Sequence, residues 1–283
     1  MGFLRTWQVV TARPLNGAFF RDSPLTVLTI DAARVRFRVE KSLDAEPNTA
    51  HIDIYNLSEG TRGEFAQRPL AVRLYAGNDG TPKRLFGGDV YWATSRPERP
   101  EWVTSIEAGD GQRAIRQAKV RRPYKAGIKA SSVIRDIVES MELKVPTLDP
   151  SSMFALQQEF ASGYTMEGPS HRELGKVLAR FGLRWSIQDG RLQILTRRGK
   201  SLETPVVVSR ETGLQGSPEL GQPKVESDPP TVKFKTQLKP ELTPGRAVLL
   251  TSRTAKGTYR VDRVRHVGDS HGSEWYSEVE ASA

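Results

Sequence analysis

The stretch from 48 to 62, NTAHIDIYNLSEGTR, joins a strand pattern directly to a helix start. Ile52 and Ile54 alternate with polar residues, which is the period of two expected of a half-buried strand. Ser58 then offers a preferred helix N-cap, because its hydroxyl accepts a hydrogen bond from an otherwise unpaired backbone N–H. An ordinary hairpin would carry a Gly or Asn turn at this point. The stretch therefore predicts a strand that leads almost at once into a short helix.

The segment before it, residues 34 to 40, alternates strictly. One side is apolar and the other is charged: Val35, Phe37 and Val39 against Arg34, Arg36, Arg38 and Glu40. Further short alternating runs and turns follow up to residue 110, about seven strands in all, which favours a closed barrel or a sandwich. We expect the short helix after Ser58 to plug one end of such a barrel.

The length and the amino-acid composition agree with a β-rich chain of more than one domain. The chain has 283 residues, of which 37% are apolar and 27% charged, with 24 Gly and 18 Pro. A single core rarely grows much beyond this size, so we expect two or three domains. The chain has no cysteine, which excludes disulfides, zinc–thiolate sites and Cys nucleophiles.

Composition divides the chain into three regions. Residues 1–110 read as the first β domain, residues 111–200 as an α+β middle region and residues 201–283 as a second β segment. The last segment includes a loop-rich stretch at 213–230 and has few strands for a barrel. We therefore expect it to take strands from the region before residue 111 or from a neighbouring chain.

Two local signals mark the middle region. Ser170 and Glu173 match a capping box at the start of an amphipathic helix. Asp189-Gly190 stands between two strand patterns and is a strong hairpin signal. A second helix carries an apolar face formed by Val133, Ile134, Ile137, Val138 and Met141.

The net charge is +9 with a pI near 9.8, so the surface attracts polyanions. The charges are spread along the chain, with small clusters at 119–125 (KVRRPYK) and 197–200 (RRGK). Neither cluster is long enough for a nucleic-acid-binding tail. We interpret residues 119–125 as a linker between the β and α+β regions. No apolar stretch is long enough to cross a bilayer.

No catalytic, cofactor or metal motif is present in the sequence. The histidines are His51, His171, His266 and His271, and His266, Asp269 and His271 lie close together in HVGDSH. That spacing matches no metal-binding pattern, so we interpret them as polar turn residues. The sequence therefore predicts a non-enzymatic protein with no catalytic, cofactor-binding or metal-binding residues.

The order of the elements resembles the central baseplate hub proteins of contractile-tailed, Mu-like phages, which are related to the hub part of type VI secretion spike proteins. Three segments carry the resemblance: the strand–strand–helix unit near the N-terminus, the α+β middle and the closing strands. The residues that match the family pattern are Phe37, Val39, Lys41, Asn48, Thr49, Ala50, Ile52, Ile54, Tyr55, Asn56, Leu57, Ser58, Pro244, Gly245, Tyr259, Val261, His266, Gly268, Asp269 and Trp275.

The resemblance implies a mixed β and α+β fold with two tube-like β-barrel domains and an α+β middle region. It also implies a homotrimer in which six barrels join a six-fold tail tube to a three-fold central spike. The implied partners are the spike protein, the tail tube protein, other baseplate proteins and the tape-measure protein, with no cofactor, no membrane and no specific nucleic acid. The implied location is the virion tail baseplate, assembled in the host cytoplasm. Because the last strand pattern runs to Ala283, we expect the piercing needle to be another polypeptide.

Two other functions remain open from the residues alone. A basic β-barrel nucleic-acid-binding protein would fit the charge, but it needs aromatic residues clustered among cations on one face. A tail-tip cell-wall hydrolase needs two carboxylates across a cleft. We identify no such aromatic cluster and no such carboxylate pair in the sequence.

Overall fold

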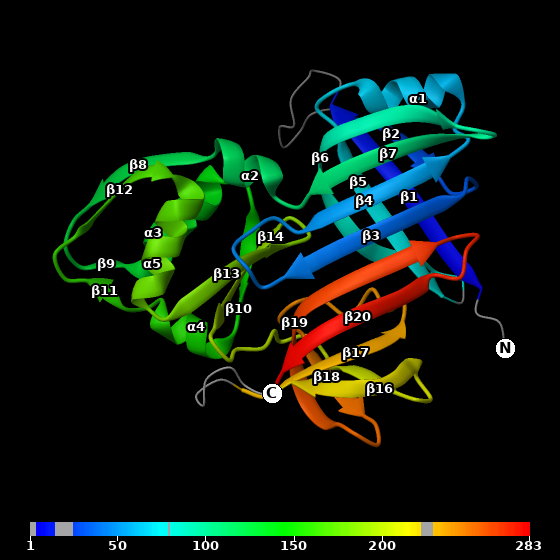
Figure 1. The fold of residues 1–283 in the computed structure, drawn as a ribbon. Coiled ribbons are helices and arrows are strands. Elements are labelled where there is room, and N and C mark those ends of the chain that lie inside the picture. The colour runs from blue at the N-terminus through cyan, green and yellow to red at the C-terminus, as the bar shows by residue number, and fades with distance from the viewer. Residues whose placement is uncertain (1–3, 15–24, 79, 222–228) are drawn as a thin grey trace.

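The computed structural model describes residues 4–14, 25–78, 80–221 and 229–283. Within these residues, 13 strands form one large sheet, and an α+β region lies beside it (Figure 1). The main path of this sheet runs in the order β16-β17-β20-β19-β3-β4-β7-β6-β5-β1-β2. The strands β18 and β15 branch from β19. The fold is therefore mostly β, as the sequence predicts.

The sheet takes its strands from both ends of the chain. They are β1 (Arg5–Pro14), β2 (Leu25–Ile30), β3 (Val35–Ser42), β4 (Thr49–Tyr55), β5 (Ala71–Asn78), β6 (Lys83–Glu98), β7 (Glu101–Gly109), β15 (Val206–Ser209), β16 (Leu214–Gly221), β17 (Thr231–Gln237), β18 (Ala247–Thr251), β19 (Lys256–Asp269) and β20 (Trp275–Ser282).

The turn after β4 explains how a strand runs into a helix. Asn56 adopts a positive φ of 56°, a conformation that Asn tolerates better than most residues. Its side-chain oxygen accepts a hydrogen bond from the Trp102 backbone N–H at 3.1 Å, which ties the turn to β7. Ser58 is the N-cap of α1 (Glu59–Ala66), and its hydroxyl accepts from the Thr61 backbone N–H at 3.2 Å. The predicted cap is confirmed.

The pairing of β3 with β19 joins the N-terminal and C-terminal strands. The two strands are antiparallel, with partners from Ser42↔Arg263 to Arg36↔Asp269. The last segment thus takes its neighbour from the strands before residue 111, one of the two arrangements that we expected. The main path is open, because its end strands β2 and β16 do not pair with each other among the described residues. The closed barrels implied by the resemblance are therefore unconfirmed in the single chain.

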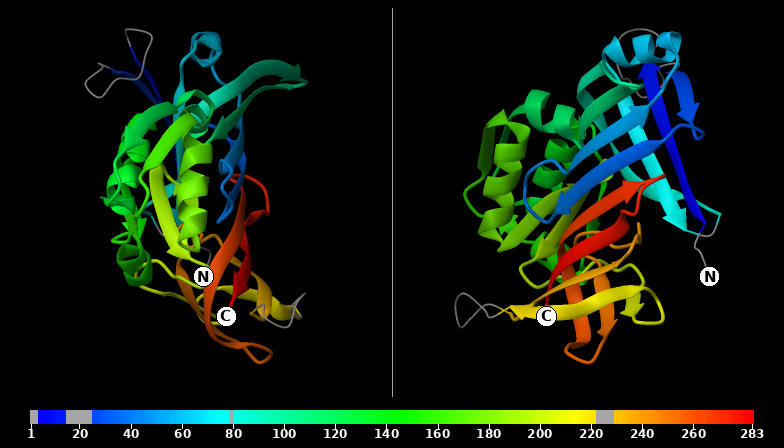
Figure 2. Two further views of the ribbon diagram at one scale, coloured as in Figure 1. Left: turned by 90° about the vertical axis from the view of Figure 1, so that its left-hand side faces the viewer. Right: turned by 45° about the vertical axis from the view of Figure 1, so that its right-hand side comes forward.

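The middle region is α+β, as predicted, and lies to one side of the sheet (Figure 2). Its Asp189-Gly190 hairpin has positive φ at both residues, which suits the right-handed twist of the flanking strands. Its elements are α2 (Gln112–Gln117), β8 (Lys119–Tyr124), β9 (Ile128–Lys129), α3 (Ala130–Ser140), β10 (Lys144–Leu148), α4 (Pro150–Ala155), β11 (Glu159–Phe160), β12 (Tyr164–Pro169), α5 (Ser170–Arg180), β13 (Leu183–Gln188) and β14 (Arg191–Thr196).

Three sequence interpretations are wrong in this fold. The basic cluster at 119–125 is not a linker, because β8 pairs with β12 along its length. The loop-rich stretch expected at 213–230 is a strand over Leu214–Gly221, where β16 forms, and its residues 222–228 lie outside the described residues. The predicted capping box at Ser170 is absent: the N-cap is Pro169, and no side chain caps the helix.

The two capping-box residues make other contacts. The buried Ser170 hydroxyl accepts a hydrogen bond from the Ser140 hydroxyl at 2.9 Å, which ties α5 to α3. Glu173 accepts from Lys176 at 2.6 Å and from the Tyr164 hydroxyl at 3.3 Å. Tertiary partners therefore outcompeted the local cap.

Three clusters of buried apolar side chains support the fold. The first lies inside β1 to β7 and includes Trp275 and Leu238 from the C-terminal segment. The second lies between α3, α5 and the β13–β14 hairpin, and it contains Trp185. The third lies among β15 to β20. Helix α3 buries Val133, Ile134, Ile137 and Val138, which confirms its predicted apolar face.

A substitution at Gly268 tests the packing contact between β3 and β19. A Cβ at this position would lie 2.2 Å from Cζ of Phe37, whose ring is buried and packs edge-on against Trp275. We expect Gly268→Ala to lower the free energy of unfolding by about 1–3 kcal/mol, because the ring has little room to move.

Gly63 in α1 is the matched control, because nothing lies within 4 Å of the Cβ that it would gain. Gly63→Ala should raise stability by about 0.5–1 kcal/mol, since Ala favours a helix interior over Gly. Chemical denaturation of both variants checks the pair. Equal effects of the two substitutions would contradict the proposed packing of Phe37 on Gly268.

Candidate functional site

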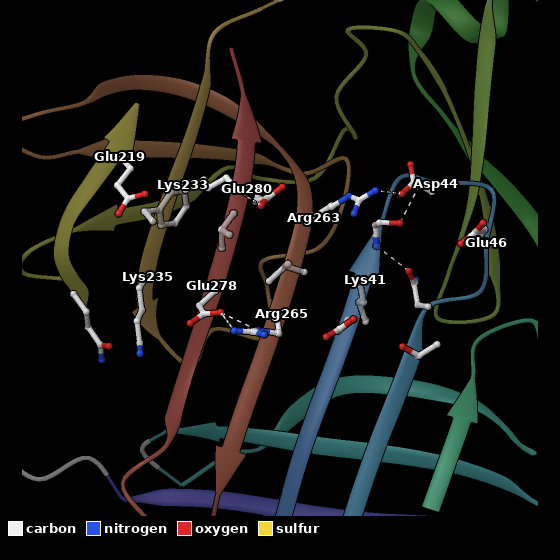
Figure 3. A pocket seen from close by; sticks show the side chains of 18 of the residues that line it. Lys41, Asp44, Glu46, Glu219, Lys233, Lys235, Arg263, Arg265, Glu278 and Glu280 are labelled. Carbon is white, nitrogen blue, oxygen red and sulfur yellow. Dashed lines mark hydrogen bonds and ion pairs between the residues drawn. The ribbon is translucent and has the colours of Figure 1, made fainter. Parts of the chain in front are cut away.

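A groove of about 790 Å³ lies on the solvent face of the sheet where β3 meets the C-terminal strands (Figure 3). Its floor is formed by β17, β20, β19 and β3, and β16 and the loop 44–48 stand at its two sides. Its ionisable lining residues are Glu40, Lys41, Asp44, Glu46, Glu219, Lys233, Lys235, Arg263, Arg265, Glu278 and Glu280.

The groove floor carries two rows of charges that alternate in sign from strand to strand. The register aligns the first row as Ser42, Arg263, Glu280, Lys233 and Glu219. It aligns the second as Glu40, Arg265, Glu278, Lys235 and Gln215. Each cation therefore faces a carboxylate or a polar residue on the neighbouring strand.

The rows form direct ion pairs. Nζ of Lys233 lies 2.6 Å from Oε1 of Glu280, and Nε of Arg265 donates to Oε2 of Glu278 at 2.8 Å. Hydrogen bonding to Glu278 raises the pKa of Arg265 above its usual value. Cross-strand pairs of this kind contribute roughly 0.2–1 kcal/mol each. Their main physical effect here is to favour the register of β17, β20 and β19 and to give the groove charges of alternating sign.

A buried polar joint connects the far end of β3 to the middle region. The Lys41 side chain is only 1% exposed, and its Nζ donates to both carboxylate oxygens of Asp189, at 3.0 and 3.1 Å. Asn48 donates to the carbonyl of Ile187 at 2.7 Å and to Oε1 of Gln188 at 2.9 Å. Two residues of the family pattern, Lys41 and Asn48, therefore hold the β13–β14 hairpin against the sheet.

Asp110 completes this joint from the end of β7. Its carboxylate accepts hydrogen bonds from the backbone N–H groups of Asp189 and Gly190, the latter at 2.7 Å. Burial, followed by the nearby charge of Asp189, raises the pKa of Asp110 to about 7. The sequence analysis did not identify Asp110, although it directly follows a strand pattern.

A second polar centre lies at the opposite end of β3. Arg34 donates to both oxygens of Asp269, at 2.8 and 3.2 Å, and the backbone N–H of His271 donates to Oδ1 of Asp269 at 2.9 Å. Burial alone would raise the pKa of Asp269, but the hydrogen bonds from Arg34, His271 and Gly272 outweigh it and lower the pKa to about 2. Asp269 thus closes the loop between β19 and β20 onto β3.

The structure corrects the interpretation of HVGDSH as a turn. His266 and Asp269 both lie in β19 and are buried, whereas His271 is exposed. Nδ1 of His266 lies 2.8 Å from the Ser277 hydroxyl, and burial lowers the pKa of His266 to about 3. Among the described residues, no group of His, Cys, Asp and Glu has a geometry suited to a metal ion.

Most other residues of the family pattern lie in the cores. Those buried are Phe37, Val39, Ala50, Ile52, Ile54, Tyr55, Leu57, Pro244, Gly245, Val261, Gly268 and Trp275. Thr49, Asn56 and Ser58 are exposed, and Tyr259 is half-buried. Gly245 has a positive φ of 87°, and its N–H donates to the Val261 carbonyl at 2.8 Å. The structure thus brings Lys41 and Asn48 together and places Asp269 at the other end of β3.

Solved structures with this fold come from phage tails and a related secretion system. No family model and no curated protein matches the sequence. A 43 kDa tail protein of prophage MuSo2 from Shewanella oneidensis aligns with a TM-score of 0.66 and 8% identity over 98% of this chain and 96% of that chain. A tail protein from Neisseria meningitidis aligns with a TM-score of 0.62 and 10% identity over the same shares.

A third structure extends the likeness beyond phages. An Escherichia coli component of the type VI secretion system, described as similar to T4 phage tail proteins, aligns with a TM-score of 0.61 and 9% identity. The alignment covers 89% of this chain and 74% of that chain. At these identities the comparisons establish the fold, and at that level they confirm the resemblance inferred from the sequence. No helix among the described residues is both long enough and apolar enough to span a bilayer.

The Lys41–Asp189 pair predicts a strong coupling between the sheet and the middle region. We expect Lys41→Met to cost about 2–4 kcal/mol of unfolding free energy, because it leaves the carboxylate of Asp189 without its main partner. Adding Asp189→Asn should recover part of this loss, since Asn also tolerates the positive φ of the turn. A double-mutant cycle measured by denaturation gives the coupling. Strictly additive effects would contradict the pair.

Asp110 predicts a pH dependence of stability. Its folded pKa of about 7 lies above the ordinary value of 3.8, so the folded state binds this proton more tightly than the unfolded state. The contribution is fully present below about pH 4 and is lost as the pH rises through 7, a change on the order of 2–4 kcal/mol.

The variant Asp110→Asn isolates this contribution. Asn is neutral at every pH, like protonated Asp110, so the unfolding free energy of the wild type, measured from pH 4 to 8, should fall relative to that of the variant as the pH rises through 7. Parallel curves over the whole interval would show that Asp110 titrates normally.

Proposed function

We propose that this chain is a structural hub of a contractile phage tail baseplate. In this role, three copies join the six-fold tail tube to the three-fold central spike. The observation that carries the proposal is the likeness to tail proteins over nearly the full length of both chains, 98% and 96% for the Shewanella oneidensis structure. Its partners are then the spike, the tail tube protein, other baseplate proteins and the tape-measure protein, and its location is the virion tail, assembled in the host cytoplasm.

The three-region division of the chain is part of this proposal. Residues 1–110 and 201–283 supply the two tube-like modules, and residues 111–200 form the α+β region between them. The three separate clusters of buried apolar side chains support this division. The two tube-like modules would share the β3–β19 seam within each chain.

The open sheet supports a ring of several copies. The end strands β2 and β16 expose backbone N–H and C=O groups, and Val27 and Leu220 on these strands are exposed apolar residues. Unpaired edges favour pairing with a neighbouring chain. A contact between two different surfaces, repeated by rotation, closes into a ring. We therefore place the seams of the trimer between β2 of one copy and β16 of the next.

The groove fits a structural role better than catalysis or nucleic-acid binding. Its cations Arg263, Arg265 and Lys233 are engaged by carboxylates of the same face. Such pairs lower the local positive potential that phosphate binding needs. No step of the proposed function therefore requires an activated nucleophile or a metal.

Oligomeric mass tests the proposal. We expect the chain, isolated with its spike partner, to contain three copies, as measured by mass photometry and by a reconstruction of the assembled particle. Only one or two copies within the assembled complex would contradict the hub.

Cysteine pairing tests the seams separately. The natural chain contains no Cys, so a chain carrying Val27→Cys and Leu220→Cys should form cross-links between copies on oxidation. A chain carrying Val27→Cys and Arg253→Cys is the control, because Arg253 lies in the exposed turn between β18 and β19. A trimer that forms no cross-link between positions 27 and 220 would agree with the hub function but would contradict seams between β2 and β16.

A further inference from the structure

The net positive charge of this protein comes entirely from its middle region. Residues 111–200 contain 17 Lys and Arg and 8 Asp and Glu, which gives +9, the value of the whole chain. Residues 1–110 contain 14 of each sign, and residues 201–283 contain 11 of each. The charges are therefore not evenly distributed, and the two segments that build the large sheet are neutral. A basic region of this kind attracts an acidic partner.

An apolar surface lies within this basic region. Phe154 and Met153 on α4 are 78% and 53% exposed, and Phe154 is the most exposed large apolar side chain among the described residues. Leu156, two residues further on, is buried. Helix α4 thus turns one side toward the core and presents Met153 and Phe154 to solvent.

The position of α4 is fixed by polar contacts. Asp149, which precedes the helix, accepts hydrogen bonds from the Ser152 hydroxyl and, at 3.2 Å, from the backbone N–H of Thr196. The turn after β14 is itself held in place, because Arg260 donates a hydrogen bond to the Arg197 carbonyl at 2.7 Å. Met153 and Phe154 therefore lie on a helix whose preceding residue, Asp149, is bonded to Thr196, and the exposed residues Arg197 and Arg198 directly follow Thr196 in the chain.

We propose that Met153, Phe154, Arg197 and Arg198, the α4 patch, form a docking surface for an acidic protein. The partner would bury Phe154 in an apolar pocket and place carboxylates against the two arginines. This goes beyond the hub function, which assigns no contact to the middle region. Protein interfaces are enriched in Phe, Met and Arg, and a few such residues supply most of the binding free energy.

Nucleic acid fits this surface less well. Binding of single strands without sequence preference combines cations with several aromatic rings for base stacking. In the middle region arginines lie over three other rings: Arg122 lies over Tyr124, and Arg180 lies over both Phe160 and Tyr164. Phe154 is therefore an isolated ring paired with a methionine, which is suited to an apolar pocket.

Photo-cross-linking in the native assembly tests the proposal. A photoreactive benzoylphenylalanine replaces Phe154, and the assembly is isolated from cells through a tag on this chain. We expect a cross-link to a different protein through a peptide with more Asp and Glu than Lys and Arg. The double variant Arg197→Glu and Arg198→Glu should reduce the cross-linked yield about tenfold. The same photoreactive residue at the exposed Leu249 on β18 is the control and should not capture that peptide.

The captured peptide then serves as a defined ligand for the full chain. Phe154→Ala should weaken its binding about tenfold, whereas Leu249→Ala and Arg253→Glu should leave it unchanged. Equal melting temperatures of these variants show that they fold. A cross-link to nucleic acid, to a peptide without net negative charge or to another copy of this chain would overturn the proposal, and so would no cross-link. The number of copies in the assembly should stay the same in every variant, so a failed hub and a failed α4 patch are distinguishable.

Discussion

The antiparallel pairing of β3 with β19 joins the two ends of the chain into one sheet. It joins residues more than 200 positions apart in the chain, from Ser42↔Arg263 to Arg36↔Asp269. Without it, the strands before residue 111 and those after residue 200 would each present another exposed edge. Such edges are liable to pair with the wrong partner. The pairing also brings Phe37 over Gly268, where the absence of a Cβ permits close contact.

Three environments are set by this one strand. The inward side chains of β3, Val35, Phe37 and Val39, enter the first apolar core. Its outward side chain Glu40 belongs to the groove. At its end, Lys41 is buried and crosses to Asp189 in the middle region. A slip of the β3 register by one residue would exchange the apolar and charged faces, so the core, the groove and the joint are specified together.

The distribution of charge gives the regions different physical roles. The sheet balances its charges in cross-strand pairs, which contribute more to register and specificity than to stability. The middle region carries the whole net charge and, among the described residues, the most exposed large apolar side chain, Phe154. A neutral, patterned sheet suits contacts between copies of one chain, whereas a basic surface with apolar anchors suits a partner of opposite charge.

The local elements of this protein are predictable from its amino-acid sequence. The period-two strands, the Ser58 cap, the apolar face of α3 and the Asp189-Gly190 hairpin depend on neighbours within a few residues, so their patterns are readable along the chain. The co-linear order of these elements also predicted the shared fold of the tail proteins.

The hydrogen-bond partners of the polar residues, in contrast, depend on contacts between distant parts of the chain. Ser170 bonds to Ser140 instead of capping its helix, His266 is buried against Ser277 instead of lying in a turn, and Lys41 reaches Asp189 across 148 positions. The open path of the sheet and the joint at Asp110 likewise depend on register between distant strands. The physical reason is that burial and long-range pairing set the free energy of a polar group, and neither is encoded in its immediate neighbours.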